Sequence, residues 1–113
     1  MKTHHQIQYI EFLAKDLAVV KKFYSDSFGW QWTDFGTRYS AFAGECVEGG
    51  FEIGDPVPGT TLPILYSDNL EASLQSVQRA GGTITQGIFS FPGGKRFHFS
   101  DPSGNILAVW SDR

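Results

Sequence analysis

The sequence has 113 residues, of which 41% are hydrophobic and 15% aromatic, and it carries a net charge of −3. This length fits one domain with a real core, although a partner subunit would help so short a chain to bury its surface. The balanced, slightly acidic charge excludes an electrostatic surface for nucleic acid, and the apolar runs are too short to cross a bilayer.

The first half of the chain, over residues 7–53, predicts a strand, a helix and three short strands. Residues 7–14 alternate between apolar and polar side chains, as a half-buried strand does. Asp16 can cap the helix that follows, and Gly29 can end it in a left-handed conformation. The apolar side of this helix should hold four residues: Leu17, Val20, Tyr24 and Phe28. Three aromatic-rich segments separated by glycines predict antiparallel strands: residues 30–35, 37–42 and 50–53.

A second half repeats this plan after a linker rich in proline and glycine at residues 54–61. Residues 62–66 predict a strand, and Asp68 can cap a second helix. The apolar stripe of that helix should hold three residues: Leu70, Leu74 and Val77. Three further strands are expected: residues 83–88, 95–100 and 106–110. The second module thus spans residues 62–111, and both modules belong to a single α+β domain over residues 1–113.

Three motifs in chain order resemble the vicinal oxygen chelate superfamily, which includes glyoxalase I, extradiol dioxygenases and bleomycin-resistance proteins. They are Phe23-Tyr24 with Phe28-Gly29-Trp30, then Ala80-Gly81-Gly82, and finally Asp101-Pro102-Ser103-Gly104-Asn105. The resemblance covers about residues 7–111. It implies two βαβββ modules that form a cup-shaped mixed or antiparallel sheet with the helices outside, and it implies a homodimer. It says less about the chemistry, because one fold supports many reactions.

Enzymes of this family usually hold a divalent metal with His, Gln and Glu side chains. By the resemblance, these ligands would fall on Tyr9, near Leu62, on Ala108 and near residues 50–52. Leucine and alanine cannot bind a metal, and tyrosine is a poor ligand for most divalent ions. We therefore expect that the usual metal site is missing and that the protein has no cofactor.

Glu11 is one candidate catalytic residue, because it shares a strand face with Tyr9, the face that the family turns toward its cavity. A carboxylate inside an aromatic cup has a raised pKa and can serve as a base. The alternative is that Glu11 pairs with Arg38 or Arg96, or faces water.

His98 is the other candidate, in a strand where Arg96 and His98 alternate with Phe97 and Phe99. If the polar face lines the cavity, His98 can act as an acid, a base or a hydrogen-bond donor. Arg96 can then bind a ligand carboxylate or phosphate. If that face points outward, this is an ordinary solvated strand.

The residues expected to contact a ligand share the presumed cavity face: Tyr9, Glu11, Phe51, Glu52, Leu62, Tyr66, Arg96, His98, Ala108 and Trp110. An aromatic wall suits a flat, aromatic or amphipathic small molecule, unless the rings fill the space completely. The first hypothesis is therefore a metal-free binding module. The alternatives are a metal-dependent lyase or dioxygenase with an altered ligand set, a metal-independent lyase or isomerase using Glu11 or His98, and an interaction protein whose role is its dimer surface.

Cys46 is the only cysteine, so no disulfide can form within the chain and a cytoplasmic setting is expected. It lies beside Glu45 and Glu48, whose negative charges disfavour a thiolate. This argues against a catalytic cysteine.

Overall fold

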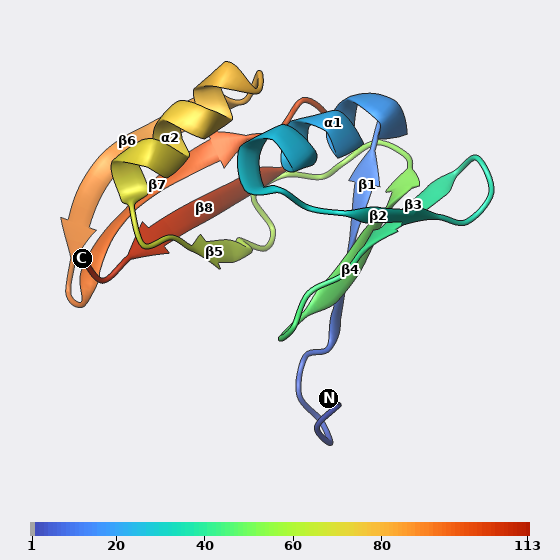
Figure 1. Cartoon of the computed structure of the whole chain (residues 1–113), viewed down its shortest axis with the longest axis horizontal. Coiled ribbons are helices and arrows are strands. Elements are labelled where there is room, and N and C mark those ends of the chain that lie inside the picture. Colours follow the sequence, from blue (N-terminus) through green and yellow to red (C-terminus); the bar gives the residue numbers. More distant parts are fainter. Residues whose placement is uncertain (1) are drawn as a thin grey trace.

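The computed structural model describes residues 2–113, which form two four-stranded sheets and two helices (Figure 1). Sheet A has the strand order β1 (Tyr9–Ala14), β4 (Glu48–Ile53), β3 (Tyr39–Phe42) and β2 (Trp32–Asp34). Sheet B has the order β5 (Ile64–Tyr66), β8 (Ile106–Ser111), β7 (Gly94–Ser100) and β6 (Thr83–Phe91). The helices are α1 (Leu17–Phe28), which follows β1, and α2 (Leu70–Arg79), which follows β5. The predicted α+β fold with two βαβββ modules is confirmed.

Both sheets have the same internal pairing. Their first strands pair in parallel with their last, β1 with β4 and β5 with β8, and the other pairs are antiparallel. A parallel pair needs a crossover connection, and in each module the helix is part of that crossover. The second module therefore repeats the topology of the first with little of its sequence.

The first helix begins and ends as its sequence predicts. Asp16 accepts a hydrogen bond from the backbone N–H of Val19 at 3.2 Å. At the other end, Gly29 has a φ of 74° and its N–H donates to the carbonyl of Ser25 at 2.9 Å. The apolar side of α1 buries Val20, Phe23 and Tyr24.

The second helix begins one residue later than predicted, because Asn69 and not Asp68 is its N-cap. The Asn69 side chain accepts from the N–H of Ala72 at 3.1 Å, and the Asn69 N–H donates to the Ser67 hydroxyl at 3.0 Å. Asn and Asp are equally good caps. The cap at Asn69 makes Leu70 the first helical residue, and this side chain is buried.

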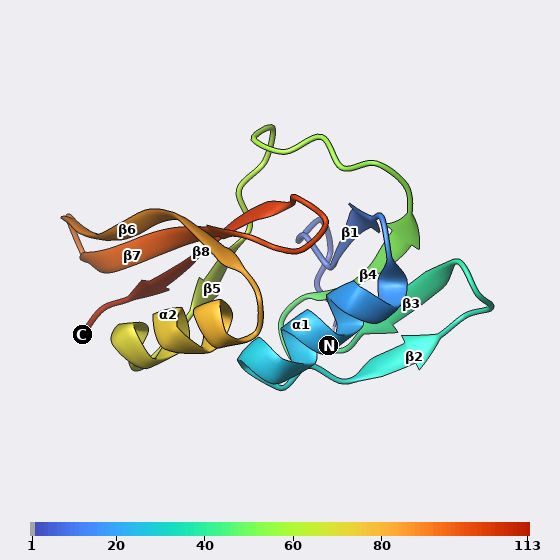
Figure 2. The ribbon, with the colours of Figure 1, turned by 90° about the horizontal axis from the view of Figure 1, so that it is seen from above.

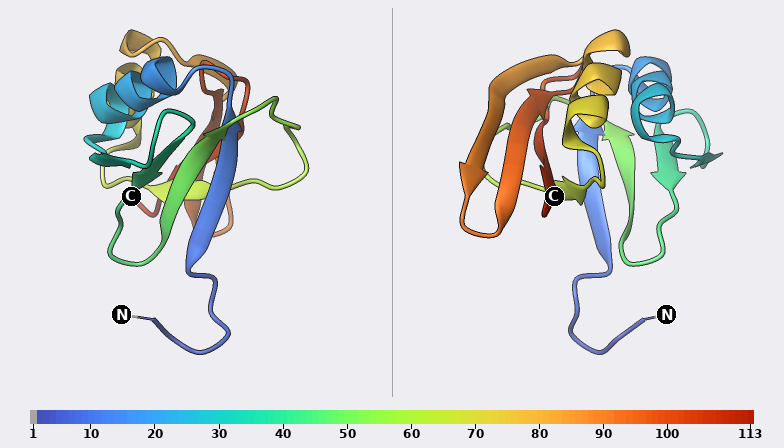
Figure 3. Two further views of the ribbon diagram at one scale, coloured as in Figure 1. Left: turned by 90° about the vertical axis from the view of Figure 1, so that its right-hand side faces the viewer. Right: turned by 60° about the vertical axis from the view of Figure 1, so that its left-hand side comes forward.

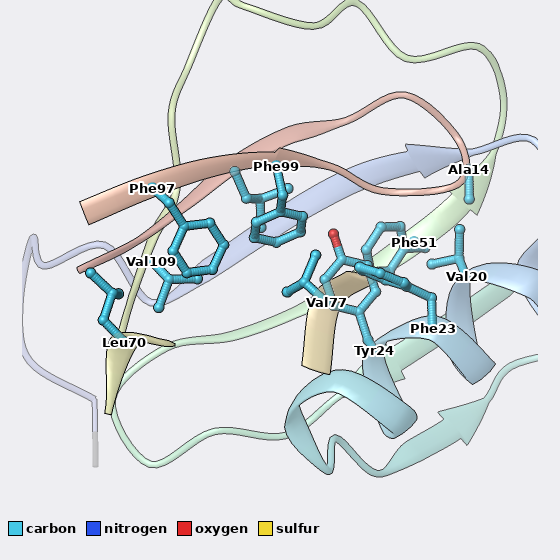
Figure 4. Close-up of a cluster of buried hydrophobic side chains, with 11 residues drawn as sticks. Ala14, Val20, Phe23, Tyr24, Phe51, Leu70, Val77, Phe97, Phe99 and Val109 are labelled. Atoms are coloured by element: carbon cyan, nitrogen blue, oxygen red, sulfur yellow. The ribbon is translucent and has the colours of Figure 1, made fainter. Parts of the chain in front are cut away.

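One core lies between the helices and the two sheets (Figure 4). From α1, the Tyr24 ring stacks on Trp30 with centroids 4.6 Å apart and lies 5.4 Å from Phe51 of β4. From α2, Leu70 and Val77 pack with the buried residues of sheet B: Phe97, Phe99, Leu107 and Val109. The predicted stripe of α2 is thus confirmed, with Leu74 only partly buried.

The turn over residues 101–105 joins the two modules. Within the turn, Asp101 accepts from the backbone N–H groups of Ser103 and Asn105 at 2.8 and 3.0 Å. Toward the first module, Asp101 accepts from the Tyr24 hydroxyl at 2.9 Å, and the Asn105 amide donates to the Leu13 carbonyl at 2.8 Å. The Ser103 hydroxyl accepts from the Lys15 N–H at 2.9 Å. This turn is therefore a polar clamp between modules as well as a connection between β7 and β8.

The helices and the linker lie on opposite sides of the molecule. Seen from above, α1 and α2 lie side by side along one edge, and the linker runs along the other (Figure 2). The two sheets remain separate and do not close into a barrel (Figure 3). Among residues 2–113, no helix is long and apolar enough to cross a membrane.

We call the face of each sheet that points away from the helices its open face. Strand alternation and register place several residues on the open face of sheet A, among them Tyr9, Glu11, Leu13, Tyr39 and Glu52. The open face of sheet B includes Ile64, Tyr66, Phe89, Phe91, Arg96, His98, Ala108 and Trp110.

Candidate functional site

The packing of β7 decides which way Arg96 and His98 point. Phe97 and Phe99 are fully buried in the core on the helix side. Because successive side chains of a strand point to opposite faces, Arg96 and His98 lie on the open face of sheet B. Periodicity left both orientations open, and the packing against the helices selects the one that makes these residues accessible to a ligand.

Aromatic rings surround the Arg96 guanidinium. Its central carbon lies 5.3 Å from the centre of the Phe89 ring and 5.6 Å from that of Phe91. Such distances give favourable cation–π contacts. On the other side, Arg96 pairs in register with Trp110 of β8, whose ring lies 6.3 Å from that of Phe91.

These residues border a hollow of about 270 Å³ that is lined by Ile64, Phe91, Arg96 and Trp110. We call it the sheet B hollow. Tyr66 stands at its edge, with its ring edge-on to Trp110 at 5.3 Å and its hydroxyl donating to Asp112 at 2.6 Å. The hollow has an apolar wall and one permanent positive charge, so it can hold a small ligand with an apolar body.

His98 lies next to this hollow, opposite Gln86 of β6 and Ala108 of β8. Its pKa is lowered from the usual value, first by burial and then by the positive charge of Arg96. The imidazole is therefore neutral at pH 7. A neutral imidazole can accept a hydrogen bond on one nitrogen and donate on the other.

A second polar cluster lies on the open face of sheet A. The hydroxyls of Tyr9 and Tyr39 are hydrogen-bonded to each other, and the Glu11 carboxylate lies close to Tyr39. Burial, the hydrogen bond with Tyr9 and the proximity of Glu11 raise the pKa of Tyr39 well above its usual range, so the phenol keeps its proton. Among the described residues no ion pair joins Glu11 to Arg38 or Arg96. Glu11 is thus a carboxylate close to a phenol, without an ion-pair partner among the described residues.

The structure corrects one of the predicted ligand contacts. Phe51 does not line a cavity: it is fully buried on the helix side of β4, with its ring stacked on Phe12 at 4.8 Å. The expectation failed because the segment offers no alternation to orient it, since Gly49 and Gly50 precede Phe51. Ala108 does lie on the open face but has no exposed surface.

The remaining predicted contacts lie in two groups. Tyr9, Glu11 and Glu52 are on sheet A, and Tyr66, Arg96, His98 and Trp110 are on sheet B, with Leu62 half-buried just before β5. Among residues 2–113, no hydrogen bond or ion pair brings the two groups together. The predicted acid–base residues Glu11 and His98 therefore belong to different sheets.

Sequence reasoning missed Phe89 and Phe91, which flank Arg96. The predicted strand ended at residue 88, whereas β6 continues to Phe91 and turns through Pro92 and Gly93 into β7. That Pro-Gly pair was the available signal, because such a pair marks a tight turn between strands.

Sequence reasoning also missed Tyr39. A β-carbon at Gly50 would lie 2.5 Å from the Tyr39 hydroxyl, so this glycine leaves the room that the phenol occupies. No pattern in the sequence indicated that Tyr39 would cover Gly50.

Comparison with known proteins identifies the fold family. The model of the Glyoxalase/Bleomycin resistance protein/Dioxygenase superfamily matches residues 6–109. The chain belongs to this superfamily. Among curated proteins, none matches the sequence at a significant level.

Solved structures of the glyoxalase superfamily have the same fold at low identity. A glyoxalase-related enzyme from Fulvimarina pelagi is 19% identical, with a TM-score of 0.83 over 95% of this chain and 88% of the other. A family enzyme from Burkholderia phytofirmans PsJN is 15% identical, with a TM-score of 0.82 over 94% and 98%. Lactoylglutathione lyase from Agrobacterium tumefaciens is 18% identical, with a TM-score of 0.75 over 97% and 96%. These likenesses establish the fold and leave the chemistry to the residues of this chain.

The side chains present do not fit the metal site that the glyoxalase superfamily implies. At the expected positions, Leu62 and Ala108 have no donor atom, and the Tyr9 hydroxyl is bonded to Tyr39. Near residues 50–52, where the fourth ligand is expected, Gly50 is covered by the Tyr39 phenol and Phe51 is buried, so only Glu52 carries a donor. Among residues 2–113, no three side chains of His, Cys, Asp or Glu are grouped as a metal site would need.

Proposed function

We propose that this member of the glyoxalase superfamily binds a small organic molecule in the sheet B hollow, without the family's usual metal. The observation that carries the proposal is the hollow itself, an apolar space on the open face of sheet B with Trp110 and Phe91 in its wall. Its volume of about 270 Å³ is just below the roughly 300–1,000 Å³ of pockets for drug-sized ligands. A compound with one or two rings suits this size.

A neutral two-ring probe, 2-naphthamide, tests the binding. We expect saturable binding in calorimetry and about a tenfold loss of affinity in Trp110→Ala, because that variant loses the largest ring of the wall. Phe35→Ala is the matched control: Phe35 is an exposed ring between β2 and β3 and should leave the affinity unchanged. Equal affinity of both variants and the wild type would refute the sheet B hollow as the site.

The proposed lack of the usual metal is tested by elemental analysis. After incubation with Zn²⁺, Ni²⁺, Mn²⁺ or Fe²⁺ and removal of free ions, we expect far less than one metal per chain, because Leu62 and Ala108 at two of the expected ligand positions have no donor atom. One tightly held metal per chain, lost on Glu11→Ala or His98→Ala, would instead favour a metal-dependent lyase or dioxygenase with an altered ligand set.

We further propose a homodimer in which the open faces meet. Ile64 is 47% and Tyr66 50% exposed although both lie in a sheet, and large apolar side chains so placed favour a partner surface.

Light scattering at micromolar concentration tests the homodimer. We expect twice the mass of one chain for the wild type and the mass of a single chain for Ile64→Asp. Val19→Asp is the control, because Val19 on α1 is also 47% exposed but lies on the helix side. A wild type of single mass, or dissociation by Val19→Asp instead, would contradict this arrangement.

A further inference from the structure

Two buried nitrogen atoms on the open face of sheet B have no hydrogen-bond partner among the described residues: Nε of Arg96 and Nε2 of His98. The residues are two positions apart on β7, so their side chains point to the same side. Buried polar groups are nearly always hydrogen-bonded, and leaving one unpaired costs roughly 1–3 kcal/mol. Among the described residues, both polar groups beside the hollow thus keep unused hydrogen-bonding capacity.

Neither Glu71 nor Asp112 forms an ion pair with Arg96. The neighbouring Lys95 pairs with Glu71 at 3.5 Å. Asp112 accepts from the Tyr66 hydroxyl at 2.6 Å and lies 3.9 Å from Arg113. Within residues 2–113, no ion pair neutralises Arg96.

The rings of Phe89 and Phe91 position the guanidinium and leave its N–H donors available. A cation–π contact involves the positive charge and the ring face, and it supplies no oxygen acceptor for the N–H groups. The guanidinium is thereby positioned before a ligand arrives, which lowers the entropic cost of binding. A planar guanidinium presents paired N–H donors that match the two oxygens of a carboxylate or phosphate.

We propose that the ligand of the sheet B hollow is an aromatic oxyanion, whose anionic oxygens bind Arg96 and whose ring packs against Trp110 and Phe91. This inference rests on the proposed function and names its ligand class. A permanent cation in an apolar wall favours an anion over a neutral acceptor, because hydrogen bonds between charged groups are about twice as strong. His98, neutral at pH 7, offers a second polar contact beside Arg96 without adding a competing charge.

Calorimetry with three matched probes tests the inference: 2-naphthoate, 2-naphthyl phosphate and the neutral 2-naphthamide. We expect the wild type to bind at least one anion ten times or more tighter than the amide, and the tighter of the two identifies carboxylate or phosphate. Arg96→Gln should bind all three with affinities like that of the amide. Arg38→Gln, which removes an exposed arginine in the turn between β2 and β3, should keep the preference for the anion.

Several results would overturn the inference. One is a wild type that binds the amide as tightly as the anions. Another is an Arg96→Gln variant that keeps the preference while melting like the wild type. A third is dissociation of the dimer by Arg96→Gln together with no anion preference in the wild type. This result would indicate that Arg96 pairs with acidic residues of a second copy of the chain. In each of these cases, the proposed function still holds if the protein binds the amide and Trp110→Ala weakens that binding. If none of the three probes binds, both the further inference and the proposed function are refuted.

Discussion

Replacing Asp101 by alanine should lower the free energy of unfolding by about 3–5 kcal/mol, measured by urea denaturation at pH 7. The carboxylate is buried and accepts from the Tyr24 hydroxyl, two backbone N–H groups of the turn and the Asn105 amide. Alanine leaves all four donors without this acceptor. Because Tyr24 belongs to the first module and the turn to the second, the loss also loosens the contact between modules.

Tyr24→Phe separates this hydrogen bond from packing. It removes one donor to a charged acceptor and keeps the ring stacked on Trp30, so the expected loss is about 1.5–3 kcal/mol. In the double variant, no buried tyrosine hydroxyl is left unpaired. Its loss of unfolding free energy should therefore be smaller than the sum of the losses of the two single variants. Additive losses, or an Asp101→Ala effect below about 1 kcal/mol, would show that the turn does not join the modules energetically.

The pH dependence of this clamp has a definite sign. Burial raises the pKa of Asp101 above its usual 3.8, although hydrogen bonds from Asn105 and Tyr24 oppose the shift. The folded state therefore favours the protonated carboxyl more than the unfolded state does. Above the pKa of Asp101 in the folded state, burial of the charged carboxylate lowers the free energy of unfolding. This cost is relieved as the pH falls toward 3.8 and the carboxyl becomes protonated. The stability difference between wild type and Asp101→Ala should accordingly grow on acidification through this range.

Local patterns predicted most of the fold. The ends of α1 were predictable from Asp16 and Gly29, because a helix cap and a left-handed residue act within a few residues of the chain. The stripe at Leu70 and Val77 predicted α2, and only the choice between the neighbouring caps Asp68 and Asn69 was wrong. Such features depend on short-range chemistry that a single sequence contains.

The candidate site was less predictable because it depends on which face each strand buries. Alternation showed that Arg96 and His98 share a face, but only the packing of Phe97 and Phe99 against the helices showed which face it is. Phe51 was misplaced because Gly49 and Gly50 give no alternation. Phe89 was missed because β6 has irregular register with β7, which breaks the pattern that would have extended the strand. The face that each strand buries and the end of β6 both depend on tertiary contacts.

Phe51→Ala should destabilise the protein by about 3–5 kcal/mol and leave the affinity for 2-naphthamide unchanged. Phe51 is fully buried, and its ring lies 4.8 Å from that of Phe12 and 5.4 Å from that of Tyr24, so truncation leaves a cavity on the helix side of sheet A. Urea denaturation measures the first effect, and calorimetry on the folded variant the second. Phe51→Leu, which fills more of the space, should lose less stability.

Trp110→Ala should give the opposite pattern, because Trp110 is only half-buried and lies on the open face of sheet B. The pair therefore separates a side chain that holds the fold together from one that meets a ligand. A stable Phe51→Ala variant that no longer binds the probe would place the ligand on the helix side of the sheets. That result would contradict the assignment of the open face as the binding surface.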